Sequence, residues 1–136
     1  MSLPDLYPGF DTRRIETSGA EIHLRTGGEG PALLLVHGYP QTHVCWHKIA
    51  PALAKRFTLV IPDLRGYGDS STPATDAGHH VYSKRAMALD LVEVMQALDH
   101  GAFLLAGHDR GGRVAYRLAL DHPGRVRRLE IGRAHV

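Results

Sequence analysis

The chain has 136 residues, a length that predicts one domain with room for a hydrophobic core. Its formal net charge of +2 and its hydrophobic content of 43% are ordinary for a soluble globular protein and do not indicate nucleic acid or another polyanion as a partner. The single cysteine, Cys45, excludes an internal disulfide. The first residues do not have the pattern of a signal peptide, and no apolar run reaches the roughly 18 residues that a membrane span requires, so we expect a cytoplasmic protein without a membrane segment.

Six segments have the patterns of strands. The first two, 13–19 and 20–28, alternate between polar and apolar side chains, as half-exposed strands do, and a turn separates them. Three continuous apolar runs are typical of strands buried on both faces, and a last strand begins near the end of the chain. These four later segments are 32–38, 57–64, 102–108 and 125–131.

Three further segments are predicted as helices. The segment 83–100 has the strongest pattern, because Ser83 can cap its first turn. A helix over 46–56 is weakened by Pro51, and a helix over 110–121 ends where a His-Pro-Gly sequence follows. The periodic apolar positions of the strongest helix are Ala86, Leu89, Val92 and Leu98.

Strands that alternate with helices predict an α/β fold, in which a mostly parallel sheet has helices on both faces. In such sheets ligands bind outside the carboxyl ends of the strands. Three unusual segments stand at predicted strand ends: HGYP at 37–40, DLRGYGDS at 63–70 and GHDRGG at 107–112. We therefore expect the functional site at this edge of the sheet.

The segment 107–111, Gly-His-Asp-Arg-Gly, has the spacing of a nucleophile elbow, a sharp turn between a strand and a helix. Gly107 and Gly111 allow the close approach of strand and helix, and the helix N-terminus stabilises the negative charge of Asp109. A carboxylate in this place can attack carbon directly and form an ester, which water must later hydrolyse. The alternative is that Asp109 only caps the helix; the two flanking glycines favour the nucleophile.

Two neighbouring features can complete such a site. The segment HGYP, which contains His37 and Gly38, can point backbone amides into it, so that the amides of Tyr39 and Arg110 form an oxyanion hole; the alternative is a simple turn. Arg110 and Arg113 lie three residues apart on one helix face and can bind a substrate carboxylate through their guanidinium groups. The alternative for either arginine is an ion pair at the surface. The other arginines of the last quarter are interleaved with apolar residues at helical spacing, which favours a solvated helix face over a nucleic-acid arm.

Metal and cofactor motifs are weak. His43 and His47 flank Cys45 but lack a glutamate base, so we predict no metal site there. His79 and His80 lie in a polar loop and are predicted to be solvated. The segment 66–70 lacks the third glycine of a dinucleotide motif, and no phosphate-loop lysine follows GHDRGG, so we expect no cofactor.

The segments HGYPQ, PDLRGYGDS and GHDRGG together resemble the N-terminal half of the α/β-hydrolase superfamily and, more narrowly, the fluoroacetate (haloacetate) dehalogenases. The resemblance runs from about Arg13 to about Leu129. It implies that Asp109 displaces halide from a 2-haloacid, that Arg110 and Arg113 hold the substrate carboxylate, that the Tyr39 backbone lines the site and that His108 is structural. Related epoxide hydrolases usually carry Trp where this chain has Arg110.

The same resemblance implies parts that this sequence does not contain. The family needs a triad acid after the next strand, a histidine near the C-terminus and halide-binding side chains from a cap domain. In register, Arg133 stands where the acid belongs. Residues 131–136, IGRAHV, can be encoded by a sequence like that of a common sequencing adapter. We therefore expect residues 1–130 to be a partial α/β-hydrolase core and 131–136 an artificial tail.

Three functions follow as hypotheses. The first is the N-terminal part of a haloacetate dehalogenase that acts on a small-molecule substrate, with a homodimer as a possible form of the full-length protein. The second is an epoxide hydrolase or another hydrolase with an aspartate nucleophile. The third is a non-catalytic module that keeps the turn around Asp109 for packing alone. In each case we expect the 136-residue chain itself to be inactive and poorly soluble, because its parallel sheet has an open edge.

Overall fold

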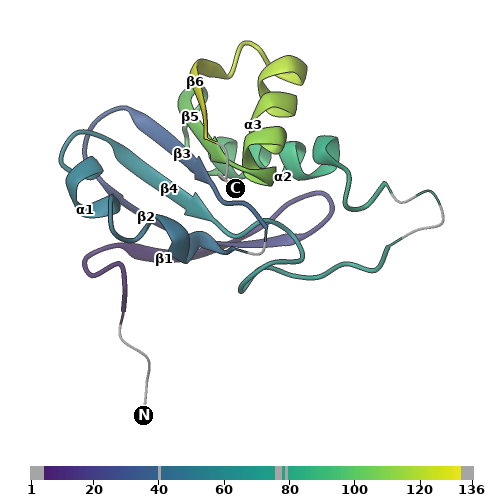
Figure 1. Cartoon of the computed structure of the whole chain (residues 1–136), viewed down its shortest axis with the longest axis horizontal. Coiled ribbons are helices and arrows are strands. Elements are labelled where there is room, and N and C mark those ends of the chain that lie inside the picture. The colour runs from purple at the N-terminus through teal and green to yellow at the C-terminus, as the bar shows by residue number, and fades with distance from the viewer. Residues whose placement is uncertain (1–4, 40, 76–77, 79, 133–136) are drawn as a thin grey trace.

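The computed structural model describes residues 5–39, 41–75, 78 and 80–132. Its strands are β1 Asp11–Glu16, β2 Glu21–Gly28, β3 Ala32–Val36, β4 Thr58–Pro62, β5 Phe103–His108 and β6 Val126–Gly132. They form one sheet with the order β1-β2-β4-β3-β5-β6 (Figure 1). β2 is antiparallel to both β1 and β4, whereas β4, β3, β5 and β6 run parallel. The predicted α/β fold with a mostly parallel sheet is therefore confirmed.

Helices cover both faces of this sheet. They are η1 His43–Trp46, α1 Ala50–Leu53, α2 Lys84–Ala97 and α3 Arg110–Asp121 (Figure 1). Side chains that alternate along β3 explain the two layers, since Leu34 and Val36 pack in one core with α2 and α3. Leu33 and Leu35 pack in the other core with Ala50 of α1. The central strands are thus buried on both sides, as their continuous apolar runs indicate.

The segment 46–56 forms much less helix than the sequence suggests. A single 3-10 turn ends at Trp46, and the α-helix begins at Ala50 and ends at Leu53. Pro51 occupies the first turn of this short helix, where its missing N–H costs nothing, but it cannot continue a helix that begins at residue 46. The prediction of one helix over 46–56 was therefore wrong in extent.

The strongest predicted helix is present as α2, and the Ser83 side chain accepts a hydrogen bond from the Ala86 amide at its first turn. Its apolar face differs from the predicted one, because Leu89 is 40% exposed. The buried residues of the helix are Met87, Ala88, Asp90, Leu91, Val92, Val94 and Met95. Because Asp90 is polar but belongs to the buried face, the pattern of apolar residues predicted the helix correctly but not which side of it faces the core.

Asp90 is buried because it forms an ion pair with Arg65 in the loop after β4. The Arg65 guanidinium donates to both Asp90 carboxylate oxygens at 2.6 Å, and the Thr17 hydroxyl donates to Asp90 as well. Arg65 also donates to the Val81 carbonyl oxygen, 2.7 Å away. These bonds fix the start of the loop 63–82 against α2. That loop follows the carboxyl end of β4, so the ion pair holds one wall of the site region in place.

Candidate functional site

Asp109 lies at the turn between β5 and α3, with backbone angles φ 56° and ψ −119°. A positive φ is uncommon for a residue with a side chain and costs energy that the surrounding structure must offset. The expected alternative, a capping aspartate, has extended backbone and a side-chain bond to the helix amides. Asp109 has neither, since no side-chain cap bond forms. Its backbone carbonyl instead accepts from the amides of Gly112 and Arg113.

Three glycines make this turn possible by close backbone contact. A Cβ at Gly107 would lie 2.5 Å from the Gly111 carbonyl oxygen, and one at Gly111 would lie 2.1 Å from the His37 carbonyl oxygen. A Cβ at Gly38 would lie 2.8 Å from the Asp109 Cβ and 3.1 Å from a carboxylate oxygen. The ends of β3 and β5 therefore meet at Asp109, and these glycines leave the space for that close approach.

Substitution of Gly111 by alanine is expected to cost about 1–3 kcal/mol of folding free energy, because the new methyl group meets backbone that cannot rotate away. Urea denaturation checks this value. Gly124→Ala is the matched control, since nothing lies within 4 Å of a Cβ at that position. Equal stability of the two variants would show that α3 does not need this close approach.

His37 joins the ends of β3 and β4 from a fully buried position. Its Nε2 accepts from the Leu64 amide at 2.9 Å, so Nδ1 carries the proton and lies 2.9 Å from the Gly38 carbonyl oxygen. In a protonated ring, Nε2 would also carry a proton, and its N–H would point at the N–H of Leu64. Burial lowers the pKa of His37 from its usual value of 6.5. The neutral His37 ring thus holds the HGYP loop in place beside Asp109.

The buried neutral ring predicts a loss of stability in mild acid. Below pH 6.5 the unfolded chain protonates His37 while the folded chain does not, so acid favours unfolding. His37 is expected to contribute a slope of at most about 1.4 kcal/mol per pH unit between pH 7 and 5. Urea denaturation across this range should show a shallower pH dependence in His37→Gln than in the unchanged chain. Parallel curves would contradict the assignment.

The predicted oxyanion amides come from the two loops that meet at Asp109. Arg110 is the first residue of α3, where a helix amide has no partner within the helix. Tyr39 follows Gly38, the residue in contact with Asp109. Among the residues that the structure describes, neither the Tyr39 nor the Arg110 amide donates a hydrogen bond. Within these residues, both amides remain as donors for a ligand.

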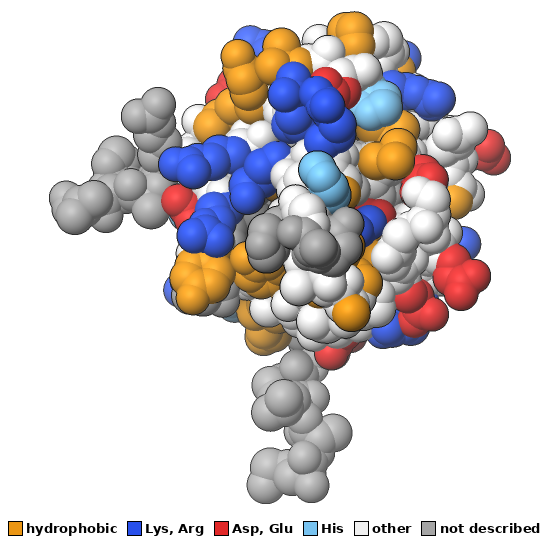
Figure 2. All heavy atoms as spheres, turned by 90° about the vertical axis from the view of Figure 1, so that its right-hand side faces the viewer, with side chains coloured by type: hydrophobic (Ala, Val, Ile, Leu, Met, Phe, Trp, Pro, Cys, Tyr) orange, Lys and Arg blue, Asp and Glu red, His pale blue; other side chains and the backbone are white. Residues whose placement is uncertain are grey.

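The arginines behind Asp109 lie on an exposed part of the surface. The Arg110 guanidinium stacks over the Tyr39 ring, with its carbon 4.7 Å from the ring centroid. Arg110 and Lys84 of α2 line the same pocket, and burial together with the charges of Arg110 and Arg113 lowers the pKa of Lys84. Figure 2 shows Lys and Arg side chains gathered on one side of the face that it presents. Sequence reasoning found the two arginines and missed Lys84.

Of the remaining residues singled out in the sequence, the structure describes His108 but not Arg133. His108 is the last residue of β5, half-buried, and pairs in register with Gly132 of β6. Ile131 and Gly132, the first residues of the proposed artificial tail, continue β6. Arg133 lies outside the described residues, as do Pro40 of HGYP and His79 of the loop predicted to be solvated. His80 is exposed but has an interaction partner.

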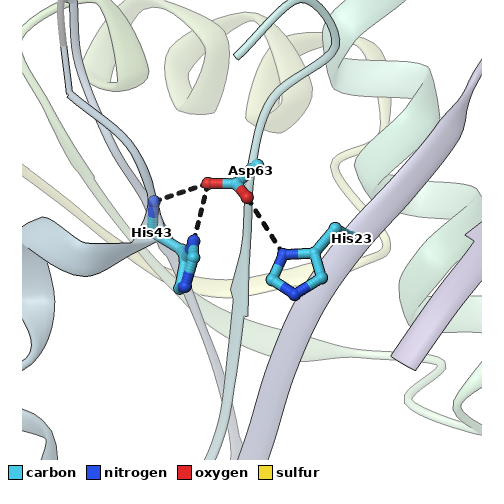
Figure 3. A group of neighbouring side chains, drawn as sticks. All are labelled: His23, His43 and Asp63. Atoms are coloured by element: carbon cyan, nitrogen blue, oxygen red, sulfur yellow. Dashed lines mark hydrogen bonds and ion pairs between the residues drawn. The ribbon is translucent and has the colours of Figure 1, made fainter. Parts of the chain in front are cut away.

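A second polar cluster lies under the loop after β4. The Asp63 carboxylate is fully buried and accepts from His23 Nδ1 at 3.0 Å and from His43 Nδ1 at 2.8 Å (Figure 3). It also accepts from the backbone amides of His43 at 2.7 Å and Asp69 at 3.0 Å. Burial alone would raise the pKa of Asp63, but the hydrogen bonds from the histidines and amides outweigh burial and hold it well below its usual value.

His23, His43 and Asp63 are the one group among the described residues whose ligand atoms lie near enough to hold a metal ion, within 4.8 Å of one another. However, four N–H donors already satisfy both Asp63 oxygens, so the cluster has the bonding of a structural clamp between β2, β4 and η1. His43, which the sequence grouped with His47 and Cys45, instead turns inward to Asp63. Cys45 is exposed as a residue, but its thiol group lies against neighbouring atoms, and this partial burial of the thiol raises its pKa to about 11.

Comparison with known proteins shows extensive similarity. The α/β hydrolase fold family matches residues 31–129. Identity to a fluoroacetate dehalogenase of Burkholderia sp. is 48% over 126 residues, which cover 93% of this chain and 41% of that protein. Identity to a soluble epoxide hydrolase of Corynebacterium sp. (strain C12) is 42% over 114 residues, which cover 84% and 38%.

The solved structures agree with this result. The crystal structure of ALR0039, an α/β-hydrolase homologue from Nostoc sp. PCC 7120, matches with a TM-score of 0.89 and 58% identity over 90% of this chain and 42% of that chain. The chain thus spans about two fifths of the length of these relatives. No helix in the described part of the chain is long and apolar enough to cross a membrane. The matched family, the sheet order and the identities lead to one conclusion: the chain belongs to the α/β-hydrolase fold family.

Proposed function

We propose that this chain is the N-terminal part of a longer hydrolase, the full-length parent, that cleaves the carbon–halogen bond of a short 2-haloacid. One observation carries the proposal: a carboxylate stands on a positive-φ turn at a strand end, with two arginines directly behind it. In the described part of the chain the Asp109 side chain takes part in no hydrogen bond or ion pair, which supports a role as nucleophile.

The proposed reaction has two steps. An Asp109 oxygen attacks the halogen-bearing carbon, a C–O bond forms, and the halide leaves with the electrons of the C–X bond. Water then attacks the carboxyl carbon of the resulting ester, which releases the 2-hydroxyacid and restores Asp109. The amides of Tyr39 and Arg110 would stabilise the oxyanion of this second step. The base that activates the water would come from the part of the parent that follows residue 130.

The carboxylate of the substrate has a partner in the arginines. Arg110 and Arg113 would hold it by charge-assisted hydrogen bonds and so orient the halogen-bearing carbon toward Asp109. The fluoroacetate dehalogenase relative, at 48% identity, supports this substrate class. Epoxide hydrolysis is the second candidate, supported by the 42% identity to the soluble epoxide hydrolase. It uses the same nucleophile but needs no carboxylate-binding arginine.

The proposal is tested by the substrate preference of the full-length parent. The parent is obtained by following the reading frame of the gene beyond the codon of Leu129. We expect release of fluoride from fluoroacetate and of chloride from chloroacetate, and little diol from styrene oxide. Diol formation without halide release would favour the epoxide hydrolase. If the intact, folded protein does neither, the result would support the third hypothesis, a non-catalytic module. A natural stop codon after Val136 would contradict both the proposal that residues 131–136 are artificial and the proposal of a longer parent.

A further inference from the structure

An open pocket of about 350 Å³ lies beside the turn that carries Asp109. Arg110 from α3 and Lys84 from α2 line it, together with the aromatic side chains Tyr39, Tyr67 and Tyr82. No acidic side chain belongs to this lining. Two cations, aromatic walls and hydroxyl groups are the surroundings that suit a small anion with a short apolar part.

The structure describes no acidic partner for the cations at this pocket. Within the described residues, Lys84, Arg110 and Arg113 make no ion pair, although the neighbouring Arg85 and Arg117 both pair with Asp121. The Asp121 carboxylate at the end of α3 neutralises Arg85 and Arg117. Lys84, Arg110 and Arg113 have only one another's positive charges nearby among the described residues.

Lys84 is held in an unfavourable place. It is the first residue of α2, where the helix dipole is positive and repels a cation. It is also half-buried, and burial together with the charges of Arg110 and Arg113 lowers the pKa of its ammonium group. An anion bound between Lys84 and Arg110 would relieve all of these penalties at once.

We propose that Lys84 is a third cationic residue of the carboxylate-binding site, which acts with Arg110 to bind a small monocarboxylate and to select it over a neutral analogue. Arg113 adds to the field without lining the pocket. Lys84 is a binding residue in this proposal, since it contacts the carboxylate and not the reacting carbon. The inference rests on the proposed function only for the identity of the carboxylate.

Binding of acetate and acetamide to the protein, in the full length that its gene encodes, tests this role. Lys84→Met keeps most of the side-chain stem and removes the charge, and we expect it to weaken acetate binding about tenfold. Acetamide binding should stay within twofold, and the salt dependence of acetate binding should become shallower. Lys84→Arg should retain most of the affinity. Lys55→Met, which removes an exposed charge remote from the pocket lining, is the matched control.

Several results would overturn the proposal. They are an acetate affinity equal in Lys84→Met and Lys55→Met, an equal loss for acetate and acetamide, or no acetate binding by the unchanged protein. Because removal of a repelled charge should not lower thermal stability, an unfolded Lys84→Met would also contradict it. Halide release is scored separately. If chloroacetate is turned over, KM should rise in Lys84→Met with kcat little changed; binding without turnover would remove the proposed function and leave this inference standing.

Discussion

Replacement of Asp109 by asparagine is expected to lower halide release by the full-length parent about 10⁴-fold or more, because the neutral amide has the same shape but cannot displace a halide. Fluoride release from fluoroacetate measures the loss. Asp121→Asn is the matched control, since it makes the same change at the far end of α3, where Asp121 pairs with Arg85 and Arg117. Undiminished turnover by Asp109→Asn would exclude the covalent mechanism.

Isotope labelling distinguishes the covalent route from direct attack by water. In a single turnover in H₂¹⁸O, the covalent route places the label in the Asp109 side chain, because water attacks the carboxyl carbon of the ester. The first 2-hydroxyacid released then carries an unlabelled oxygen from Asp109. Mass spectrometry of the peptide that contains residue 109 and of the product checks both statements. Label in the product of the first turnover would contradict the proposed nucleophile.

The sequence predicted the sheet well because each strand carries its own local signal. Continuous apolar runs mark β3, β4 and β5, whose side chains pack on both faces. The helix predictions were weaker where a contact distant in sequence decides the outcome. Asp90 is polar and is not among the predicted apolar positions of α2, but Arg65, 25 residues away, neutralises it in the core. A hydrophobic period cannot show such a pair.

The candidate site also contains one part that the sequence could predict from a local motif and one part that depends on contacts between distant residues. The motif around Asp109 is local, since Gly107 and Gly111 stand two residues on either side and the strand–turn–helix pattern surrounds them. The cluster of His23, His43 and Asp63 is not local: the carboxylate lies 40 residues from one histidine and 20 from the other. The pairing of β2 with β4 brings His23 to Asp63, and the packing of η1 against β4 adds His43. An aspartate directly after a buried strand was the one available signal.

Lys84 was missed for a related reason. A lysine at the start of a helix follows no motif, and its meaning depends on α2 and α3 lying side by side with their first turns close together. Contacts between these helices and the electrostatic effect of Arg110 and Arg113 on Lys84 provide that information. A cation at a helix N-terminus opposes the usual preference for acidic residues there, and that local conflict is the signal which sequence reasoning could have used.

Substitution of Asp63 by asparagine is expected to cost about 3–5 kcal/mol of folding free energy at pH 7, because it breaks a buried and fully bonded carboxylate. The amide keeps one acceptor oxygen and turns an NH₂ group toward donors of His23, His43 or Asp69. At least one buried donor then loses its partner. Asp69→Asn is the matched control: its side chain is 68% exposed and 4.0 Å from His23, so a change within about 0.5 kcal/mol is expected. Urea denaturation measures both.

The same carboxylate predicts how stability responds to strong acid. Its pKa is lower in the folded chain than in the unfolded chain, so its contribution is fully present above the unfolded pKa near 3.8 and is lost as the pH falls toward the folded value. Unfolding free energies measured from pH 7 to pH 2.5 should therefore fall less steeply below pH 4 in Asp63→Asn than in the unchanged chain. The His37 effect lies at higher pH and should persist in this variant. If the two proteins lost stability in parallel below pH 4, the clamp at Asp63 would not be the source of the acid sensitivity, and an exposed group such as Asp69 would have to account for it.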